Sequence, residues 1–334
     1  MSIIDMNGFC RKAEEYHVLG VVVQQHGQEI ARQLWDAPRR RDVYSVSKSF
    51  TSVAVGIAQR EGLLSLDEKL TDAFAEDLPD FVSPHLEKAA VRDLLTMCLG
   101  QGKPFLMGAD RPFYQETDWV KLSLSQPWVC DPDTTFLYNN AGPYLAGMLV
   151  QRRSGCDLIH YLMPRLFVPL GIHLPTWEMD PLGNSYGAGG LFLNIDELAK
   201  FGRLLLQDGN WNGKQLIPSD WVREAGRKQV DNGEDGYGYL FWIENGIFSM
   251  TGMFGQIISY CPQYDAVIAT MNSCIKEGDN ERLLKSVLLN AFAEKSDARR
   301  MASLSVFPFA KQPTKAEVKT SPAPQKKPST FSCP

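Results

Sequence analysis

The chain has 334 residues, of which 44% are hydrophobic and 22% charged, and a formal net charge of −5. This composition is typical of a folded globular protein, and the length favours two structural lobes. Because an acidic chain offers no broad basic surface, we expect no nucleic-acid partner. No stretch is long and apolar enough to span a bilayer, and residues 1–7 lack the basic and apolar regions of a signal peptide. We therefore expect a cytoplasmic protein without a membrane partner.

The N-terminal part of the chain predicts a helix, a hairpin and a second helix. Residues 3–16 have amphipathic helical spacing, and residues 18–24 and 29–35 are apolar runs separated by a glycine-containing turn. Such a pair of runs is typical of a β-hairpin. Small and apolar residues then follow Ser45 with helical spacing, which predicts a largely buried helix that begins near this serine.

The rest of the chain alternates between helical and strand-like patterns. From residue 62 to residue 153, helical periods interrupted by proline and glycine predict a mostly helical region. A further helix is predicted at 195–207, ahead of a turn at 210–214. Residues 236–272 are glycine-punctuated, alternating apolar runs that predict strands, and residues 281–295 predict a closing helix.

Strands near both ends of the chain around a helical middle predict an α+β fold. We assign residues 1–70 and 185–296 to an α/β lobe and residues 71–184 to a mostly helical lobe. Residues 297–334 contain little to bury, and five lysines lie between residues 311 and 334. This segment is predicted to be a disordered basic tail.

The spacing of Ser45 and Lys48 is the strongest indication of a catalytic function in the sequence. On a helix, a lysine three residues after a serine projects from the same face, where it can act as the base that a serine nucleophile needs. Burial and the positive end of the helix dipole both disfavour the ammonium form of Lys48. The lysine pKa must fall from about 10.4 to roughly 7–8 for this role at neutral pH. The pattern predicts a nucleophile with its own base.

Two other serines compete with Ser45. Ser273 and Lys276 repeat the spacing, but they follow an apolar run that predicts a strand, so we interpret this match as accidental. Residues 183–187 satisfy G-x-S-x-G around Ser185, the nucleophile-elbow pattern, which needs a strand before it and a helix after it. Here the surrounding residues indicate a loop that enters a strand. We interpret this segment as a glycine loop near the site.

The cysteines and histidines give no metal or disulfide pattern. The seven cysteines are scattered, and none of them forms a C-x-x-C pair. The five histidines contain no pair at i, i+4 and no H-E-x-x-H motif. We therefore expect reduced thiols, no bound metal and no cofactor.

A third motif completes a set that resembles a known superfamily. Tyr138 and Asn140 belong to the only Tyr-x-Asn triplet in the chain. Together with Ser45 and Lys48, this triplet is similar to the motifs of the superfamily of serine β-lactamases, penicillin-binding proteins and family VIII carboxylesterases. The class C-like branch is the most similar, and short similar sequence segments occur in the same order over residues 15–295.

The resemblance implies a β-lactamase/transpeptidase-like fold, in which a central antiparallel sheet flanked by helices joins a mostly helical lobe. It implies that Ser45 is the acyl-accepting nucleophile and Lys48 its partner. Tyr138 would be a second base that passes a proton to the leaving group and helps to activate water. Asn140 would orient Lys48 and the acyl side of the substrate. A nearby ammonium, such as that of Lys48, would favour the phenolate of Tyr138.

The last motif of the superfamily, usually Lys-Thr-Gly or His-x-Gly, aligns with Met250, Thr251 and Gly252. We assign Thr251, Gly252 and Met253, with Asn140, to substrate binding. Gly252 allows the strand to approach the substrate, and the backbone N–H of Met253 would form an oxyanion hole with that of Ser45. Methionine provides neither charge nor a strong hydrogen bond for a substrate carboxylate. This departure favours neutral substrates.

The sequence as a whole predicts a serine hydrolase that acts through an acyl-enzyme on a small-molecule ester or amide. One alternative is a β-lactamase or a D-alanyl-D-alanine carboxypeptidase-like activity. The other is a catalytically inactive binding or scaffold protein, because a fold does not by itself imply activity. Neither the physiological substrate nor the oligomeric state follows from the sequence.

Overall fold

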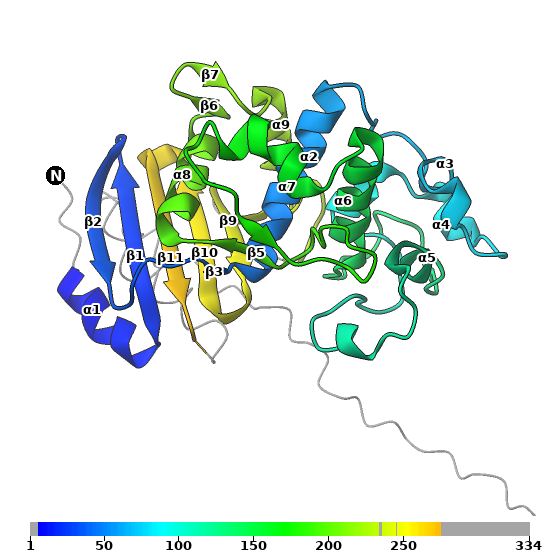
Figure 1. The fold of residues 1–334 in the computed structure, drawn as a ribbon, viewed down its shortest axis with the longest axis horizontal. Coiled ribbons are helices and arrows are strands. Elements are labelled where there is room, and N and C mark those ends of the chain that lie inside the picture. Colours follow the sequence, from blue (N-terminus) through cyan, green and yellow to red (C-terminus); the bar gives the residue numbers. More distant parts are fainter. Residues whose placement is uncertain (1–5, 234–235, 245, 275–334) are drawn as a thin grey trace, which may run out of the picture.

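The computed structural model describes residues 6–233, 236–244 and 246–274. Its main element in these residues is a six-stranded antiparallel sheet with the order β2, β1, β11, β10, β9 and β8 (Figure 1). Strands from distant parts of the sequence therefore lie side by side in the middle of the sheet. The strands are β1 Val18–Gln25, β2 Gln28–Leu34, β8 Trp242–Glu244, β9 Ile247–Gly252, β10 Gln256–Cys261 and β11 Ala266–Asn272.

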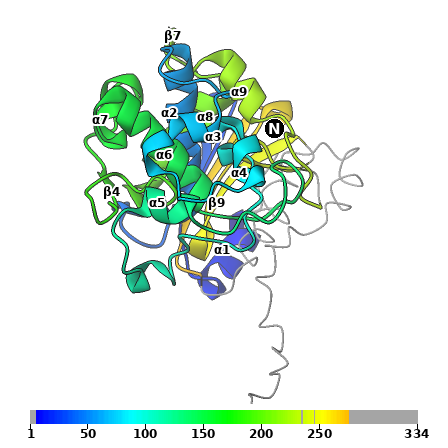
Figure 2. The ribbon, with the colours of Figure 1, turned by 90° about the vertical axis from the view of Figure 1, so that its right-hand side faces the viewer.

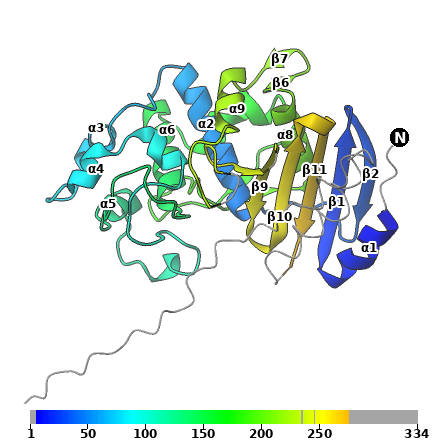
Figure 3. The same ribbon diagram turned by 180° about the vertical axis from the view of Figure 1, so that it is seen from behind.

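Helices cover both faces of this sheet, which explains the long apolar runs in its central strands. On one face, Val21 of β1 packs in a cluster with Phe9 of α1 (Met6–Glu15). On the other face, Val22 joins the main core, to which α8 (Ile195–Leu206) contributes most of its buried residues. Views from opposite sides show the two helices on opposite faces of the sheet (Figures 1 and 3). Neighbouring residues of β1 are therefore both buried.

Helix α2 (Ser47–Arg60) passes through the middle of the molecule, between the sheet and the more helical half (Figure 1). Figure 2 views the molecule from the more helical side. Every residue from Ser47 to Ala58 is buried. Helix α6 (Ala141–Ser154) packs against it. The remaining α-helices of the described residues are α3 Leu70–Ala73, α4 Pro84–Lys88, α5 Trp119–Leu124, α7 Leu158–Leu162 and α9 Ser219–Ala225.

Short elements connect these helices and strands. The 3₁₀ turns are Tyr44–Val46, Ala75–Asp77, Val91–Leu95, Arg111–Phe113, Met253–Gly255 and Pro262–Tyr264, and Met163–Phe167 forms a π turn. A small sheet combines β3 Arg41–Asp42, β4 Thr176–Trp177 and β5 Leu191–Leu193, and a hairpin combines β6 Asn210–Trp211 and β7 Lys214–Gln215.

The longer predicted elements are present nearly where the sequence placed them. The predicted strands at 18–24 and 29–35 correspond to β1 and β2, and the predicted helix at 195–207 corresponds to α8. The predicted helical region that ends at residue 153 closes with α6. The predicted turn at 210–214 is the hairpin of β6 and β7. These segments have strong periodicity and clear end signals, so local sequence is enough to predict them.

The part between residues 70 and 124 is less regular than its helical periods suggest. Its α-helices have four, five and six residues, because proline and glycine recur too often there for longer ones to form. The boundaries of the two lobes remain a prediction.

Two predictions concern the C-terminal part of the chain. The predicted helix at 281–295 and the predicted disordered tail at 297–334 lie outside the described residues. In the described part of the chain, no helix combines the length and the apolar character needed to cross a membrane.

A close backbone contact at the start of α6 gives a test of the packing. A Cβ atom added to Gly142 would lie 2.5 Å from the carbonyl oxygen of Leu94, a backbone atom that cannot move away easily. Gly142→Ala should therefore lower the free energy of unfolding by about 1–3 kcal/mol, as measured by urea denaturation.

Gly147 in the same helix provides a matched control. Its added Cβ would lie 3.2 Å from a side-chain methyl of Leu158, which can adjust. Because alanine is the better helix former, Gly147→Ala should change the stability by less than about 1 kcal/mol. Equal stabilities of the two variants would contradict the backbone contact at Gly142.

Candidate active site

Ser45 lies in the 3₁₀ turn that leads directly into α2, slightly earlier than the predicted first turn of the helix. The preceding chain is held by the small sheet, in which Arg41 and Asp42 pair with Leu193 and Phe192 of β5. Tyr44 has a φ of +48°, an uncommon conformation for a bulky residue that persists only where the surroundings fix it. Its N–H donates to Oδ1 of Asp42 at 2.6 Å.

Lys48 is buried, with 2% of its side chain exposed, and its amine has two oxygen partners. Nζ lies 2.9 Å from Oγ of Ser45 and donates to the carbonyl oxygen of Ala188 at 2.6 Å. Burial lowers the pKa of Lys48 to about 7, and the positive charge of Arg111 acts in the same direction. A large fraction of Lys48 is therefore neutral at neutral pH, and its free lone pair can accept the Ser45 proton.

Tyr138 is the third member of the cluster. Nζ of Lys48 lies 5.1 Å from the centre of the Tyr138 ring, and the ring stacks on Trp242 at 5.7 Å. Burial raises the pKa of Tyr138 to about 12, although a hydrogen bond with Ser45 opposes this shift. The expectation that a nearby ammonium would favour the phenolate is wrong, because burial outweighs the groups that would lower the pKa. Tyr138 therefore keeps its proton at neutral pH.

Asn140 lies beside the cluster at the end of the Tyr-x-Asn motif. Its Nδ2 donates to the carbonyl oxygen of Leu106 at 3.0 Å, whereas its buried Oδ1 has no hydrogen-bond partner. The expectation that Asn140 orients Lys48 does not agree with these contacts, because Ser45 and Ala188 hold the amine instead. A contact between Asn140 and the acyl side of a substrate remains a prediction.

The third motif reaches the site through Gly252, at the end of β9. A Cβ atom added there would lie 2.4 Å from the carbonyl oxygen of Val43 and 3.3 Å from Cβ of Tyr44. Only glycine therefore allows the strand to approach the chain just ahead of Ser45. Met253 follows with 43% of its side chain exposed, and its part in an oxyanion hole remains a prediction.

Met250 and Thr251 lie on opposite faces of the sheet. Met250 pairs with Ile258 and is buried in the main core, while Thr251 pairs with Ile257, which belongs to the cluster around α1. Paired residues of antiparallel strands share a face. Met250 is thus a packing residue, and a substrate contact for Thr251 remains a prediction.

Arg111 is a component of the site that sequence reasoning missed. Its guanidinium lies 4.2 Å over the ring of Tyr186 and donates to Glu178 at 2.8 Å. It belongs to a short 3₁₀ turn in a loop without periodicity, so nothing in the local sequence indicates that it comes near Lys48. Only the tertiary fold brings this cation to the site.

The glycine loop contributes backbone oxygens, as its predicted place near the site suggests. Gly187 accepts from the Thr51 hydroxyl and Ala188 accepts from Lys48, both residues of α2. Ser185 itself is fully buried, and its main-chain N–H and C=O both bond to the amide of Gln151. Ser185 thus has neither the exposure nor the strand-to-helix turn of a nucleophile elbow.

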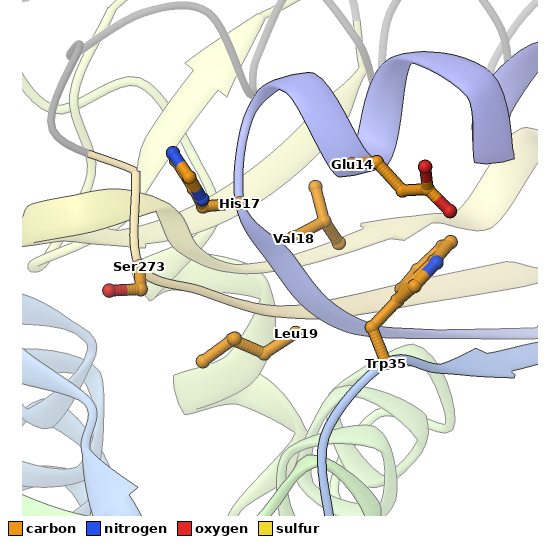
Figure 4. Close-up of a pocket in the computed structure, with 6 residues that line it drawn as sticks. All are labelled: Glu14, His17, Val18, Leu19, Trp35 and Ser273. Atoms are coloured by element: carbon orange, nitrogen blue, oxygen red, sulfur yellow. The ribbon is translucent and has the colours of Figure 1, made fainter.

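Ser273 lies in the loop directly after β11 and lines a separate cavity of about 490 Å³ (Figure 4). Glu14 and His17 line the same cavity and would supply the residue types of a catalytic triad. In Figure 4, Glu14 lies across the cavity from His17 and Ser273, so the three side chains do not form a chain of contacts. Lys276, the partner of Ser273 in the repeated spacing, lies outside the described residues.

The described residues contain no group of three or more histidine, cysteine, aspartate or glutamate side chains that could hold a metal ion. The described site brings together a hydroxyl, an amine and a phenol, those of Ser45, Lys48 and Tyr138. This set can transfer an acyl group to serine and move protons around it.

Two curated proteins are similar to parts of this chain. The chain is 26% identical over 153 residues to a 6-aminohexanoate-dimer hydrolase of Paenarthrobacter ureafaciens, covering 41% of the chain and 39% of the relative. It is 25% identical over 197 residues to penicillin-binding protein 4 of Amycolatopsis lactamdurans, covering 49% of the chain and 50% of the relative. The matches thus span half or less of these two curated relatives.

Solved structures agree on the fold. A putative 6-aminohexanoate-dimer hydrolase from Bacillus anthracis superposes with a TM-score of 0.71 at 19% identity, over 88% of this chain and 82% of that one. An octameric penicillin-binding protein homologue from Pyrococcus abyssi gives 0.68 at 19%, over 81% and 74%. The predicted β-lactamase/transpeptidase-like fold is confirmed. The sequence model of the family described as Beta-lactamase matches residues 9–289, and the chain therefore belongs to the β-lactamase family.

Proposed function

We propose that this protein is a serine hydrolase that forms an acyl-enzyme at Ser45 with a small carboxylic ester or amide. The observation that carries the proposal is the 2.9 Å contact between Oγ of Ser45 and a buried Lys48 whose pKa is lowered to about 7. A serine hydroxyl becomes an effective nucleophile when a base of this kind lies within hydrogen-bond distance.

Acylation follows from the arrangement of the three side chains. One N–H of the neutral Lys48 amine donates to Ala188, which leaves the lone pair free to accept the Ser45 proton as Oγ attacks the carbonyl carbon. The Tyr138 hydroxyl then donates its proton to the departing alcohol or amine and recovers a proton from the Lys48 ammonium. Lys48 returns to its neutral form, and the acyl group stays on Ser45.

Deacylation repeats these transfers with water. Water attacks the acyl carbonyl carbon and passes one proton to Lys48. Oγ of Ser45 then leaves by taking that proton from the Lys48 ammonium, which releases the carboxylic acid and returns Lys48 to its neutral form. The net reaction consumes one ester or amide and one water and gives a carboxylic acid and an alcohol or amine. Each positioned proton transfer of this kind contributes about a hundredfold to ten-thousandfold in rate.

The two alternatives differ from this proposal in testable ways. A β-lactamase or a D-alanyl-D-alanine carboxypeptidase would bind an anionic substrate, whereas Met250 provides no charge for one and the Arg111 guanidinium is already paired with Glu178. The names of the relatives do not separate the first alternative from the proposal, because one is a 6-aminohexanoate-dimer hydrolase and another a penicillin-binding protein. An inactive scaffold does not need a buried lysine with a lowered pKa against a serine.

Labelling with a fluorophosphonate probe tests the nucleophile. The adduct should lie on the peptide that contains Ser45, because that serine has a base at 2.9 Å, and Ser45→Ala should abolish labelling. Mass spectrometry of the digested protein locates the adduct. Ser273→Ala, which changes an exposed loop serine away from Lys48, serves as the control and should label like the wild type. An adduct on Ser185, or no adduct at all, would contradict the proposal.

Substitution of the two proton carriers tests the mechanism. Lys48→Met and Tyr138→Phe should each lower kcat on p-nitrophenyl esters by about a hundredfold to ten-thousandfold, since each removes a positioned proton transfer. Tyr161→Phe is a matched control, because it removes a hydroxyl that bonds to Glu61 at the far end of α2, roughly 20 Å from Lys48 along the helix. Folded Lys48→Met or Tyr138→Phe with nearly full activity would rule out the proposed mechanism.

Comparison of two substrate classes tests the choice of neutral substrates. The value of kcat/KM for p-nitrophenyl butyrate should exceed that for nitrocefin by at least about tenfold. The reason is that a missing charge-assisted hydrogen bond to the nitrocefin carboxylate costs about 1.5–3 kcal/mol. Ser45→Ala gives the background rate for both substrates. If the wild type instead hydrolysed nitrocefin more efficiently, the β-lactamase alternative would replace the present one.

A further inference from the structure

We propose that Arg111 is a positioning residue for this site: it holds a fixed positive charge beside Lys48 and ties its own loop to the segment whose Ala188 carbonyl binds the Lys48 amine. This inference rests on the proposed function for its kinetic consequence, but the charge effect on Lys48 can be measured without any activity.

A short chain of contacts leads from Arg111 to Lys48. The guanidinium stacks at 4.2 Å on Tyr186, and the backbone N–H of Ala188 donates to the carbonyl oxygen of Tyr186 at 2.7 Å. The carbonyl of Ala188 in turn accepts from Nζ of Lys48 at 2.6 Å. Arg111 therefore packs on the same short segment that fixes the Lys48 amine.

The ion pair with Glu178 fixes the place of the guanidinium. Glu178 accepts from Arg111 at 2.8 Å, and its carbonyl oxygen accepts the N–H of Tyr186 at 2.8 Å. Only 18% of the Arg111 side chain is exposed, and its Nε is buried without a hydrogen-bond partner. Stacking, ion pair and burial together restrict the guanidinium to one location.

Besides burial, the charge of Arg111 lowers the pKa of Lys48. An arginine stays protonated at all relevant pH values, and a nearby positive charge disfavours a second one. Arg111 accordingly acts with burial to lower the pKa of Lys48, which enlarges the neutral fraction at neutral pH. Charged or titratable groups around Lys48 and Arg111 are Tyr138, Tyr186, Tyr114, Asp110, Asp42 and Glu178.

Titration of Lys48 by NMR tests the charge effect directly. The protein is labelled with ¹³C at lysine Cε, and the Lys48 signal is assigned by its loss in Lys48→Met. Relative to the wild type, Arg111→Met should raise the midpoint by about half to one pH unit, the size expected for one partly neutralised charge near a buried amine. Arg111→Lys, which keeps the charge, should remain closer to the wild type.

Glu178→Gln should shift the Lys48 midpoint in the opposite direction. This variant also tests the charge effect if Arg111→Met fails to fold. Removal of the carboxylate leaves the Arg111 charge less neutralised, so the Lys48 midpoint should fall. Arg165→Met is the matched control, because Arg165 makes the same pair of contacts far from the site, a 4.1 Å stack on Tyr161 and an ion pair with Glu61 at 2.8 Å. The Lys48 midpoint should not move in that variant.

Kinetics separate this inference from the proposed function. Activity should rise with pH as Lys48 loses its proton, and the acid limb of kcat/KM for p-nitrophenyl butyrate should shift upward in Arg111→Met by the same amount as the NMR midpoint. An unchanged Lys48 midpoint in folded Arg111→Met or Glu178→Gln would overturn the inference even if activity were lost. A shifted midpoint in a protein that the fluorophosphonate probe does not label would support the charge effect and reject the proposed function.

Discussion

The burial of the Lys48 amine is the constraint on which the rest of the site depends. Burial of an ammonium without compensation costs several kcal/mol of desolvation free energy. Two features of Lys48 reduce this cost. It takes oxygen partners in Ser45 and Ala188, and it gives up its proton near neutral pH. Both adaptations suit the proposed catalysis, because they bring the amine to the serine and free its lone pair. The same burial would be destabilising for a lysine with no partner.

The sequence of α2 shows how a polar site is built into a buried helix. Ser47, Ser49 and Thr51 each use a hydroxyl to bond to a main-chain carbonyl oxygen, those of Tyr44, Leu240 and Gly187. Because the helix is buried from Ser47 to Ala58, an unpaired hydroxyl costs free energy there, and among its serines and threonines in this range only Ser52 has an Oγ without a hydrogen-bond partner. The bond from Thr51 to Gly187, together with the bond from Lys48 to Ala188, holds the glycine loop against the helix next to Lys48. Ser47, Ser49 and Thr51 thus have a structural role beside Ser45 and Lys48, the residues of the proposed mechanism.

Local sequence could predict the helix with its serine and lysine, because the spacing of the two residues places them on one face. It could also predict β1, β2, α6 and α8, whose periodicities are strong. It could not predict that Tyr138 has a raised pKa, since that depends on how Trp242 and the surrounding protein exclude water from the ring. The contacts of Asn140 likewise depend on Leu106, which lies in an irregular loop.

The positive charge near Lys48 does not come from the motif position that carries a cation in the superfamily. The motif of the superfamily usually carries a lysine or histidine where this chain has Met250, and the structure buries that methionine in the core of the sheet. A cation nevertheless acts on Lys48, and it comes from a loop through Arg111. Its place depends on Glu178 and Tyr186 rather than on a strand register. An alignment of the motif alone would miss this cation, which acts on Lys48 and is paired with Glu178 rather than free for a substrate carboxylate.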